Sequence, residues 1–250
     1  MRIPIISLLL LFLLSASAQS DPSSPEYDPA YVNILKKNKI KAVHLVKMGD
    51  TIESHFYNTE GQLKKVAFLE SEFTDEEEWM DYSYNPDGTL DKVVYHMGEY
   101  DVITHQYSYE DGLPVRSVLD GAEPREYTYT HENGKVTRIT RKTAYVVFDE
   151  ETDEESVEWK EIEEELFTYA DDGRIASYQF LFYGEPYSLT RFYFDKKGQL
   201  EKKVYYYGDP TEDPIETVTA SYNKGLISSS VSTSHIDETI ITINYQYEKC

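Results

Sequence analysis

One short pattern returns along most of the chain, and it limits the fold more than any other feature. Two aromatic residues one position apart are followed by polar residues, a glycine and two aliphatic residues three positions apart. Clear copies read YSYNPDGTLDKV at 82–93, FTYADDGRIASY at 167–178 and FYFDKKGQLEKKV at 192–204. Weaker copies occupy 36–43, 55–66, 107–118, 127–139 and 220–231. A chain of similar units is therefore expected.

Each copy has the composition of a β-hairpin. Aromatic residues two positions apart lie on the same face of a strand. Asn, Asp and Gly adopt the left-handed backbone that a tight hairpin turn needs. A second set of turns, such as Gly98-Glu99 and Gly208-Asp209-Pro210, falls between the copies. The sequence therefore predicts an all-β fold, an antiparallel meander of about 14–16 strands.

A sheet of this size does not stay flat, because open sheets beyond about ten strands curl, split or close. Segment 239–247 alternates Ile and Tyr with polar residues, which gives one dry and one wet face. We expect a curved or rolled sheet with an apolar concave side, and leave open whether it is open, spiral or closed. The acidic interval 148–166 could form a helix, because Glu-rich segments favour helices. Two longer strands, TAYVVF at 143–148 and SVEWKEIEEELFTY at 156–169, joined by an acidic loop, are the preferred interpretation. One short helix is predicted near 29–36, where Asp28 can cap it and Pro29 fits its first turn.

The first 18 residues have the pattern of a secretory signal peptide. A basic Arg2 precedes the apolar run 5–14 and the small residues Ala16-Ser17-Ala18. We expect a linker at 19–29 and a single hairpin-repeat domain at 30–250. No later segment has the length of a membrane-spanning helix. The expected location is the periplasm, the cell surface or the extracellular space.

Charge and composition narrow the classes of partner. The formal net charge is −22, which argues against nucleic-acid backbones and anionic membrane surfaces. With 23 Tyr, 10 Phe and 2 Trp, the chain is too rich in aromatic residues to be a disordered acidic protein. No nucleophile elbow, His-Glu-x-x-His motif or phosphate loop is present, so neither a catalytic residue nor a cofactor is predicted.

Two weak metal candidates stand beside plainer interpretations. If Gly49-Asp50 forms a two-residue turn, His44 lies opposite His55 on one sheet face and the pair could bind a metal. Packing within the sheet is the simpler role for both rings. Oxygen ligands for a weak calcium site come from Asp149, Glu150, Asp153 and Glu154. These acids also suit a solvated tip that blocks edge pairing between sheets.

The aromatic residues of the copies should form rows across the sheet, where they stabilise strand pairing. Where such rows are exposed, they offer a surface for protein or glycan contact. The residues proposed for that surface are Tyr82, Tyr84, Tyr107, Tyr109, Tyr127, Tyr129 and Tyr169.

The motif Tyr-x-Tyr-(Asn/Asp)-x-x-Gly-x-Leu-x-x-Val resembles the YD repeat of RHS-type proteins, most closely at 82–93, 167–178 and 192–204. The resemblance implies an antiparallel sheet that grows by successive hairpins into a curved wall. It also implies a bacterial secreted or surface protein. Some members of that family enclose a toxin, and others act in adhesion or carbohydrate contact. The copies here are degenerate, and no toxin-sized domain is expected after them.

The leading hypothesis is a secreted, non-enzymatic repeat protein whose sheet contacts an unknown protein or glycan. The alternative is a secreted carboxylate-dependent glycoside hydrolase, which needs two inward carboxylates in one apolar pocket. An outer-membrane β-barrel is less favoured. Its strands need an apolar outward face, and segments 157–166 and 198–208 carry charges on both faces.

Overall fold

The computed structural model describes residues 29–69, 78–97, 101–121, 124–149, 154–208 and 213–249. The segments expected to be a signal peptide and most of the linker, 1–28, lie outside the described residues. The helix is α2 (Pro29–Lys37). The strands are β1 (Ile40–Lys47), β2 (Asp50–Tyr57), β3 (Leu63–Phe68), β4 (Glu78–Tyr84), β5 (Leu90–Met97), β6 (Asp101–Glu110), β7 (Leu113–Asp120), β8 (Arg125–Glu132), β9 (Lys135–Asp149), β10 (Glu154–Tyr169), β11 (Ile175–Phe182), β12 (Glu185–Phe194), β13 (Leu200–Tyr207), β14 (Glu216–Asn223), β15 (Leu226–Ser234) and β16 (Ile240–Lys249).

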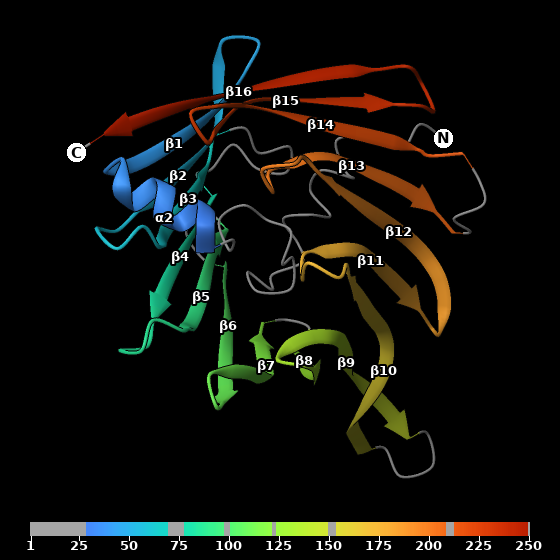
Figure 1. Ribbon diagram of the computed structural model, residues 1–250. Helices are drawn as coiled ribbons and strands as arrows, with labels where there is room; N and C mark the ends of the chain where they lie inside the picture. The colour runs from blue at the N-terminus through green and yellow to red at the C-terminus, as the bar shows by residue number, and fades with distance from the viewer. Residues whose placement is uncertain are drawn as a thin grey trace.

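The sixteen strands pair in chain order, each antiparallel to the next, and β1 pairs with β16 (Figure 1). The sheet therefore closes into a barrel. The prediction of an antiparallel meander with a short N-terminal helix is confirmed, and closure decides the shape that the sequence left open. Among the described residues, no helix is long and apolar enough to cross a membrane.

The repeat glycines lie in hairpin turns at one end of the barrel, which we call the repeat end. In the β6–β7 turn, Asp111 and Gly112 have φ of 52° and 78°, the left-handed values of a two-residue hairpin turn. The β4–β5 turn is longer. There the Asn85 amide donates to the Thr89 carbonyl at 2.8 Å, and Gly88 takes the left-handed φ of 91°.

A β-bulge explains the spacing of the two aliphatic residues in each copy. Residues three apart would face opposite sides of a regular strand. In the β2–β3 hairpin, however, Tyr57 pairs with Leu63 whereas Phe56 pairs with Lys65, so one residue is extra. Leu63 and Val66 are both buried as a result. The same shift recurs in the hairpins β4–β5, β10–β11, β12–β13 and β14–β15. Bulges increase strand twist, which helps a sheet to curl and close.

Closure completes an eighth copy from the two ends of the chain. β16 brings the aromatic half, and Tyr247 pairs with Val43 of β1. β1 brings the aliphatic half, in which Ile40 and Val43 are each 2% exposed. A register shift between Ile40 and Ala42 repeats the bulge of the other copies. We call this pairing the split hairpin.

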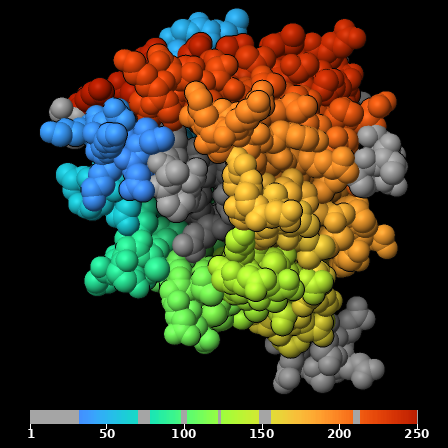
Figure 2. All heavy atoms as spheres, viewed as in Figure 1, coloured from blue at the N-terminus to red at the C-terminus, as the bar shows by residue number. Residues whose placement is uncertain are grey.

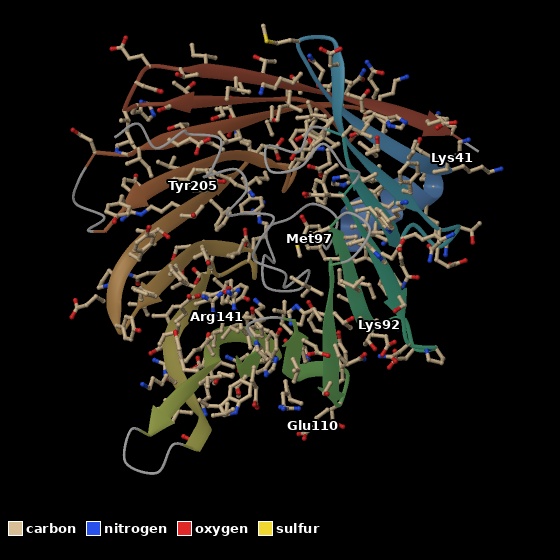
Figure 3. The ribbon with its side chains drawn as sticks, turned by 180° about the vertical axis from the view of Figure 1, so that it is seen from behind. Lys41, Lys92, Met97, Glu110, Arg141 and Tyr205 are labelled. Atoms are coloured by element: carbon tan, nitrogen blue, oxygen red, sulfur yellow. The ribbon has the colours of Figure 1, made fainter. Side chains whose placement is uncertain are left out.

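The aromatic face of the sheet forms the inside of the barrel. Figure 3 shows Met97 and Arg141 pointing into the barrel, whereas Lys41 and Lys92 point away from it. Two buried clusters line this inner face. One includes Leu35, Val43, Leu63, Val66, Leu90, Val93, Tyr107 and Ile227, and the other includes Leu119, Tyr127, Ile139, Phe167, Ile175 and Phe192.

Helix α2 lies at the repeat end, between the β2–β3 and β14–β15 turns. Leu35 is fully buried. A Cβ on Gly61 would lie 2.8 Å from the Val32 carbonyl oxygen, and one on Gly225 would lie 3.3 Å from Ile34 Cδ1. Figure 2, which looks onto this end, shows α2 on the same face of the molecule as the repeat turns.

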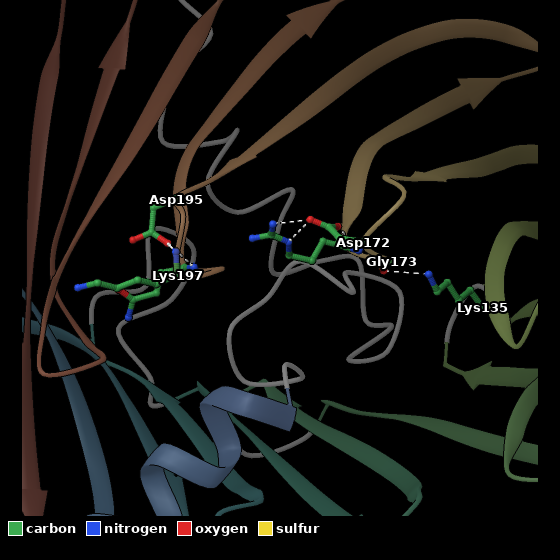
Figure 4. A network of polar contacts seen from close by, with 7 residues as sticks. Lys135, Asp172, Gly173, Asp195 and Lys197 are labelled. Carbon is green, nitrogen blue, oxygen red and sulfur yellow. Dashed lines mark hydrogen bonds and ion pairs between the residues drawn. The ribbon is translucent and has the colours of Figure 1, made fainter.

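Neighbouring repeat turns also contact each other through polar groups (Figure 4). Lys135 Nζ donates to the Gly173 carbonyl at 3.0 Å, which links the β8–β9 and β10–β11 turns. Gln62 Nε2 donates to the Gly88 carbonyl at 3.2 Å, which links the β2–β3 and β4–β5 turns. These contacts hold the repeat end together beyond the strand pairing.

Strands β9 and β10 are the longest, at 15 and 16 residues, as the sequence predicted for this interval. β8 pairs with β9 as far as Thr143, and β11 pairs with β10 as far as Glu163. The remaining residues, 144–149 and 154–161, project from the end of the barrel opposite the repeat end as a two-stranded ribbon (Figure 1). We call this projection the β9–β10 ribbon.

Candidate functional site

The seven tyrosines proposed for a contact surface lie in the barrel wall. Tyr107, Tyr127 and Tyr129 are at most 5% exposed. Burial raises the pKa of the Tyr107 and Tyr129 phenols above the ordinary value of 10.0. The partly buried members, which pack against the two clusters, are Tyr82, Tyr84, Tyr109 and Tyr169. In this structure the rings pack within the wall of the barrel.

The register expected for the first hairpin is wrong. The turn residues are Met48 and Gly49, with φ of 53° and 103°, rather than Gly49 and Asp50. This turn alone would place His44 opposite Glu53, but a register shift between Leu45 and Val46 moves the pairing by one residue. His44 therefore lies opposite Ser54, and His55 lies opposite Val43. A one-residue shift of register moves a side chain to the other face of a sheet.

The two histidines consequently face opposite sides of the wall and cannot share a metal. His44 Nδ1 lies 2.8 Å from Ser54 Oγ, and His55 Nε2 contacts the Glu53 carboxylate on the inner face. Across the described parts of the chain, no group of three or more His, Cys, Asp or Glu residues could hold a metal ion.

Of the calcium candidates, Asp149 ends β9 and Glu154 begins β10, where the two residues pair. Glu150 and Asp153 lie outside the described residues.

Among the described residues, several carboxylates face the interior, which is the feature that a hydrolase would need; Glu165, which pairs with the buried Ile139, is one of them. Burying a carboxylate is unfavourable unless a partner satisfies it. Glu78 accepts a hydrogen bond of 2.6 Å from the Tyr95 hydroxyl. The other pairs are Glu53 with His55, Glu163 with Arg141, and Glu216 with the Ser232 hydroxyl. A side chain of the wall thus engages Glu53, Glu78, Glu163 and Glu216.

A buried hydrogen-bond network centres on His105. Its Nε2 lies 2.8 Å from Ser117 Oγ, which lies 2.8 Å from the Tyr129 hydroxyl. Its Nδ1 lies 3.2 Å from the Tyr107 hydroxyl. A serine beside a histidine is the first requirement for a nucleophilic pair. His105 and Ser117 are each 1% exposed, so no substrate reaches them and the network is structural.

Four exposed aromatic residues gather near the β11–β12 turn, at the end of the barrel opposite the repeat end. The rings lie on β11, β12 and β13 and in the turn that joins β11 to β12. Their exposed fractions are 41% for Phe182, 64% for Tyr183, 42% for Tyr187 and 54% for Tyr207. Together with the partly buried Phe180, we call these residues the rim aromatic cluster.

The rings of this cluster touch edge to face. The ring centroids of Tyr187 and Tyr207 are 5.0 Å apart, and those of Phe180 and Tyr187 are 5.8 Å apart. Phe182 and Tyr183 form a third such pair at 4.6 Å. Partial desolvation, and then the neighbouring Tyr207, raise the pKa of the Tyr187 phenol.

A bulge places Tyr187 in this position. Phe180 pairs with Ser188 whereas Leu181 pairs with Pro186, so Tyr187 is the extra residue of its strand. The Gly208 amide donates to the Tyr187 carbonyl at 2.8 Å and fixes the backbone there. The repeat motif does not mark this cluster, because its members lie between the copies. The signal that could have revealed it is the density of rings in FLFYGEPY (180–187) and YYY (205–207), beside the turns between copies.

No protein-family model and no curated protein matches the sequence. Among solved structures, the chain is similar to a porin-like protein from Bacteroides uniformis, with a TM-score of 0.53 and 14% identity over 84% of this chain and 98% of that chain. A porin-like protein from Bacteroides vulgatus has a TM-score of 0.48 and 9% sequence identity, over 84% of this chain and 99% of that chain. The Tc holotoxin pore of Photorhabdus luminescens has a TM-score of 0.29 and 11% sequence identity, over 87% of this chain and 13% of that chain. The first match shows a shared fold, and fold alone does not identify function.

Proposed function

We propose that the protein is an exported, non-enzymatic, YD-repeat-like barrel that binds neutral glycans through the rim aromatic cluster. One observation carries the proposal: four aromatic rings from three adjacent strands and the β11–β12 turn are between 41% and 64% exposed at one end of the barrel. Monomeric proteins rarely expose apolar groups together without a binding role.

The chemistry of the cluster suits a sugar ring. Tyr and Phe offer flat apolar faces, and the tyrosine hydroxyls offer hydrogen bonds at the ring edge. A pyranose has the matching surfaces, with C–H groups on its face and hydroxyls around its rim. The net charge of −22 disfavours anionic ligands, which leaves neutral glycans as the favoured class.

Repeat copies and the N-terminal pattern support the remaining parts of the proposal. The motif at 82–93 and its copies at 167–178 and 192–204 support the likeness to the YD repeat. The basic and apolar start of the chain supports export, as does the porin-like name of the similar Bacteroides uniformis protein. Mass spectrometry of the exported protein should give a chain that begins at Gln19. A chain that begins at Met1 would contradict export by cleavage after Ala18.

The charged side chains on the outer wall of the barrel support a protein that is surrounded by water rather than by a lipid bilayer. A membrane barrel needs an apolar band on its outward face. Here the outward side chains form ion pairs, such as Arg116 with Glu126 at 2.7 Å and Arg138 with Glu164 at 3.2 Å. We therefore expect the folded protein to stay monodisperse without detergent.

Binding can be tested on an array of neutral glycans with the chain that begins at Gln19. Tyr187→Ala and Tyr207→Ala should each weaken the best binder by about tenfold or more. Tyr193→Ala is the matched control, because Tyr193 is 41% exposed but lies beside Lys202, away from the cluster. Retention of no neutral glycan, or equal binding by all three variants, would overturn the proposal. Glycan cleavage on the same array would favour the hydrolase instead.

A further inference from the structure

The β9–β10 ribbon combines three features that the proposed glycan site does not use. First, it carries exposed apolar side chains: Val146 is 69% exposed, Val157 60% and Trp159 46%. Val157 pairs with Val146, and Trp159 pairs with Ala144. Residues that pair across strands share a face, so these side chains form one apolar stripe.

Second, the ribbon has free edges. β10 pairs with β11 no further than Glu163, apart from a hydrogen bond of 2.7 Å from the Tyr183 amide to the Ile162 carbonyl. Among the described residues, no strand pairs with 154–161 on the side away from β9. A free edge presents unpaired amides and carbonyls, which is a template for another strand.

Third, the ribbon is strongly acidic. The described residues of the ribbon, 144–149 and 154–161, include five acidic residues and one basic residue, a net charge of 1 − 5 = −4. Like charges repel, so this edge disfavours pairing with a second copy of itself. The same charge attracts a basic strand. The acids therefore select among the occupants that the free edge could accept.

From these features we propose that the outer edge of β10, 154–161, is a docking site for an extended basic segment of a partner protein. The segment adds as a strand, and its main chain bonds the free edge. Its apolar side chains lie along Val157 and Trp159, while its Lys or Arg residues face acids such as Glu158. The site adjoins the rim aromatic cluster where the Tyr183 amide bonds the Ile162 carbonyl, but the two share no residue and separate variants test each.

A synthetic peptide of alternating valine and lysine is a suitable probe. Trp159 reports binding by fluorescence in a Trp79→Phe background, which removes the other tryptophan. Hydrogen exchange measured by mass spectrometry should show new protection over 154–161. The same peptide N-methylated at alternate amides cannot complete the ladder and should not bind. A valine–glutamate peptide should not bind either.

Variants separate the apolar and charged contributions. Trp79→Phe with Val157→Thr should weaken the valine–lysine peptide by about tenfold. Glu158→Lys with Glu161→Lys should weaken it by a similar factor and reduce its dependence on salt. The matched controls are Val102→Thr, which changes a valine that is 54% exposed on β6, and Glu201→Lys, which reverses an exposed acid on β13. Both should stay within about twofold of the parent.

Several results would overturn the proposal. The site is not a strand edge if the N-methylated peptide binds as well as the parent peptide. It is not selective for basic partners if the valine–glutamate peptide binds, or if the protein alone forms a dimer that Glu158→Lys disrupts. Absence of binding by the valine–lysine peptide, or protection outside 154–161, would also reject it.

Discussion

The hydroxyl of Tyr84 in β4 donates a hydrogen bond of 2.8 Å to the main-chain carbonyl of Leu63 in β3. The second aromatic residue of one copy thus holds the first aliphatic residue of the copy before it. The same contact joins Tyr169 to Val136 at 2.7 Å, Tyr222 to Leu200 at 2.9 Å and Tyr247 to Ile227 at 2.6 Å. The motif therefore encodes a link between copies as well as a hairpin within each copy.

Removal of one such hydroxyl should weaken the barrel slightly. Tyr84→Phe leaves the Leu63 carbonyl without this donor, and we expect the free energy of unfolding in urea to fall by about 1 kcal/mol. Tyr193→Phe is the control, because Tyr193 faces solvent beside Lys202. An equal effect of the two substitutions would show that the hydroxyl contact contributes nothing.

The ion pair between Arg141 and Glu163 should behave as a buried pair. Their side chains are 19% and 11% exposed. Glu163→Leu leaves the Arg141 charge inside the wall and should lower stability by about 3–5 kcal/mol. Arg141→Met combined with Glu163→Leu should recover most of that loss, because two apolar groups then replace the pair. Thermal and urea unfolding of the four proteins of this cycle measure the coupling, and additive effects would contradict it.

The barrel should lose stability in alkali. Desolvation by burial raises the pKa of the Tyr107 and Tyr129 phenols above 10.0. The folded state therefore holds these protons more tightly than the unfolded chain does. The stability that these protonated phenols contribute is complete below the pKa that tyrosine has in the unfolded chain. It is lost as the pH rises above that pKa, by up to about 1.4 kcal/mol per pH unit for each phenol. Circular dichroism during urea unfolding between about pH 9 and about pH 12 checks the slope. Tyr129→Phe should make the slope shallower, and an unchanged slope would contradict the assignment.

Two glycine substitutions should separate the cost of backbone strain in a turn from the cost of disturbing the contact between a turn and helix α2. Gly61 and Gly112 both have left-handed φ, at 80° and 78°. A Cβ on Gly112 meets nothing within 4 Å, whereas one on Gly61 lies 2.8 Å from the Val32 carbonyl oxygen. Both alanine variants should lose about 1–2 kcal/mol from backbone strain. Gly61→Ala should lose more and should increase hydrogen exchange in α2. Equal losses with unchanged exchange would mean that the helix is not held by this turn.

The hairpins could be predicted from sequence because their determinants are local. Asn85 and Gly88, for example, lie within one turn and contact each other there. The β-bulges were also encoded, since Leu63 and Val66 are three positions apart in a strand. The pairing of His44 could not be predicted, because the left-handed φ of Met48 moves the turn by one residue and a β-bulge between Leu45 and Val46 then shifts the register once more. A methionine gives no sequence signal for that conformation.

Closure and the rim aromatic cluster depend on contacts between distant residues, which a local pattern does not report. Val43 and Tyr247 lie on the first and last strands, so their pairing depends on the curvature of the whole sheet between them. Tyr187 reaches Phe180 and Tyr207 through a bulge that no repeat element marks. The candidate tyrosines were found by their place in the copies, and that place is the inner face of the wall.

The split hairpin has a consequence for how such a barrel can change in size. The pairing that closes this barrel is antiparallel: β1 and β16 run in opposite directions where Val43 pairs with Tyr247. One additional strand would bring two parallel strands to the seam, where this pairing could not form. While the antiparallel seam is kept, the circumference grows or shrinks by two strands, one whole copy, at a time. Duplication or deletion of one copy is the smallest step by which a gene of this kind could evolve a wider or narrower ring.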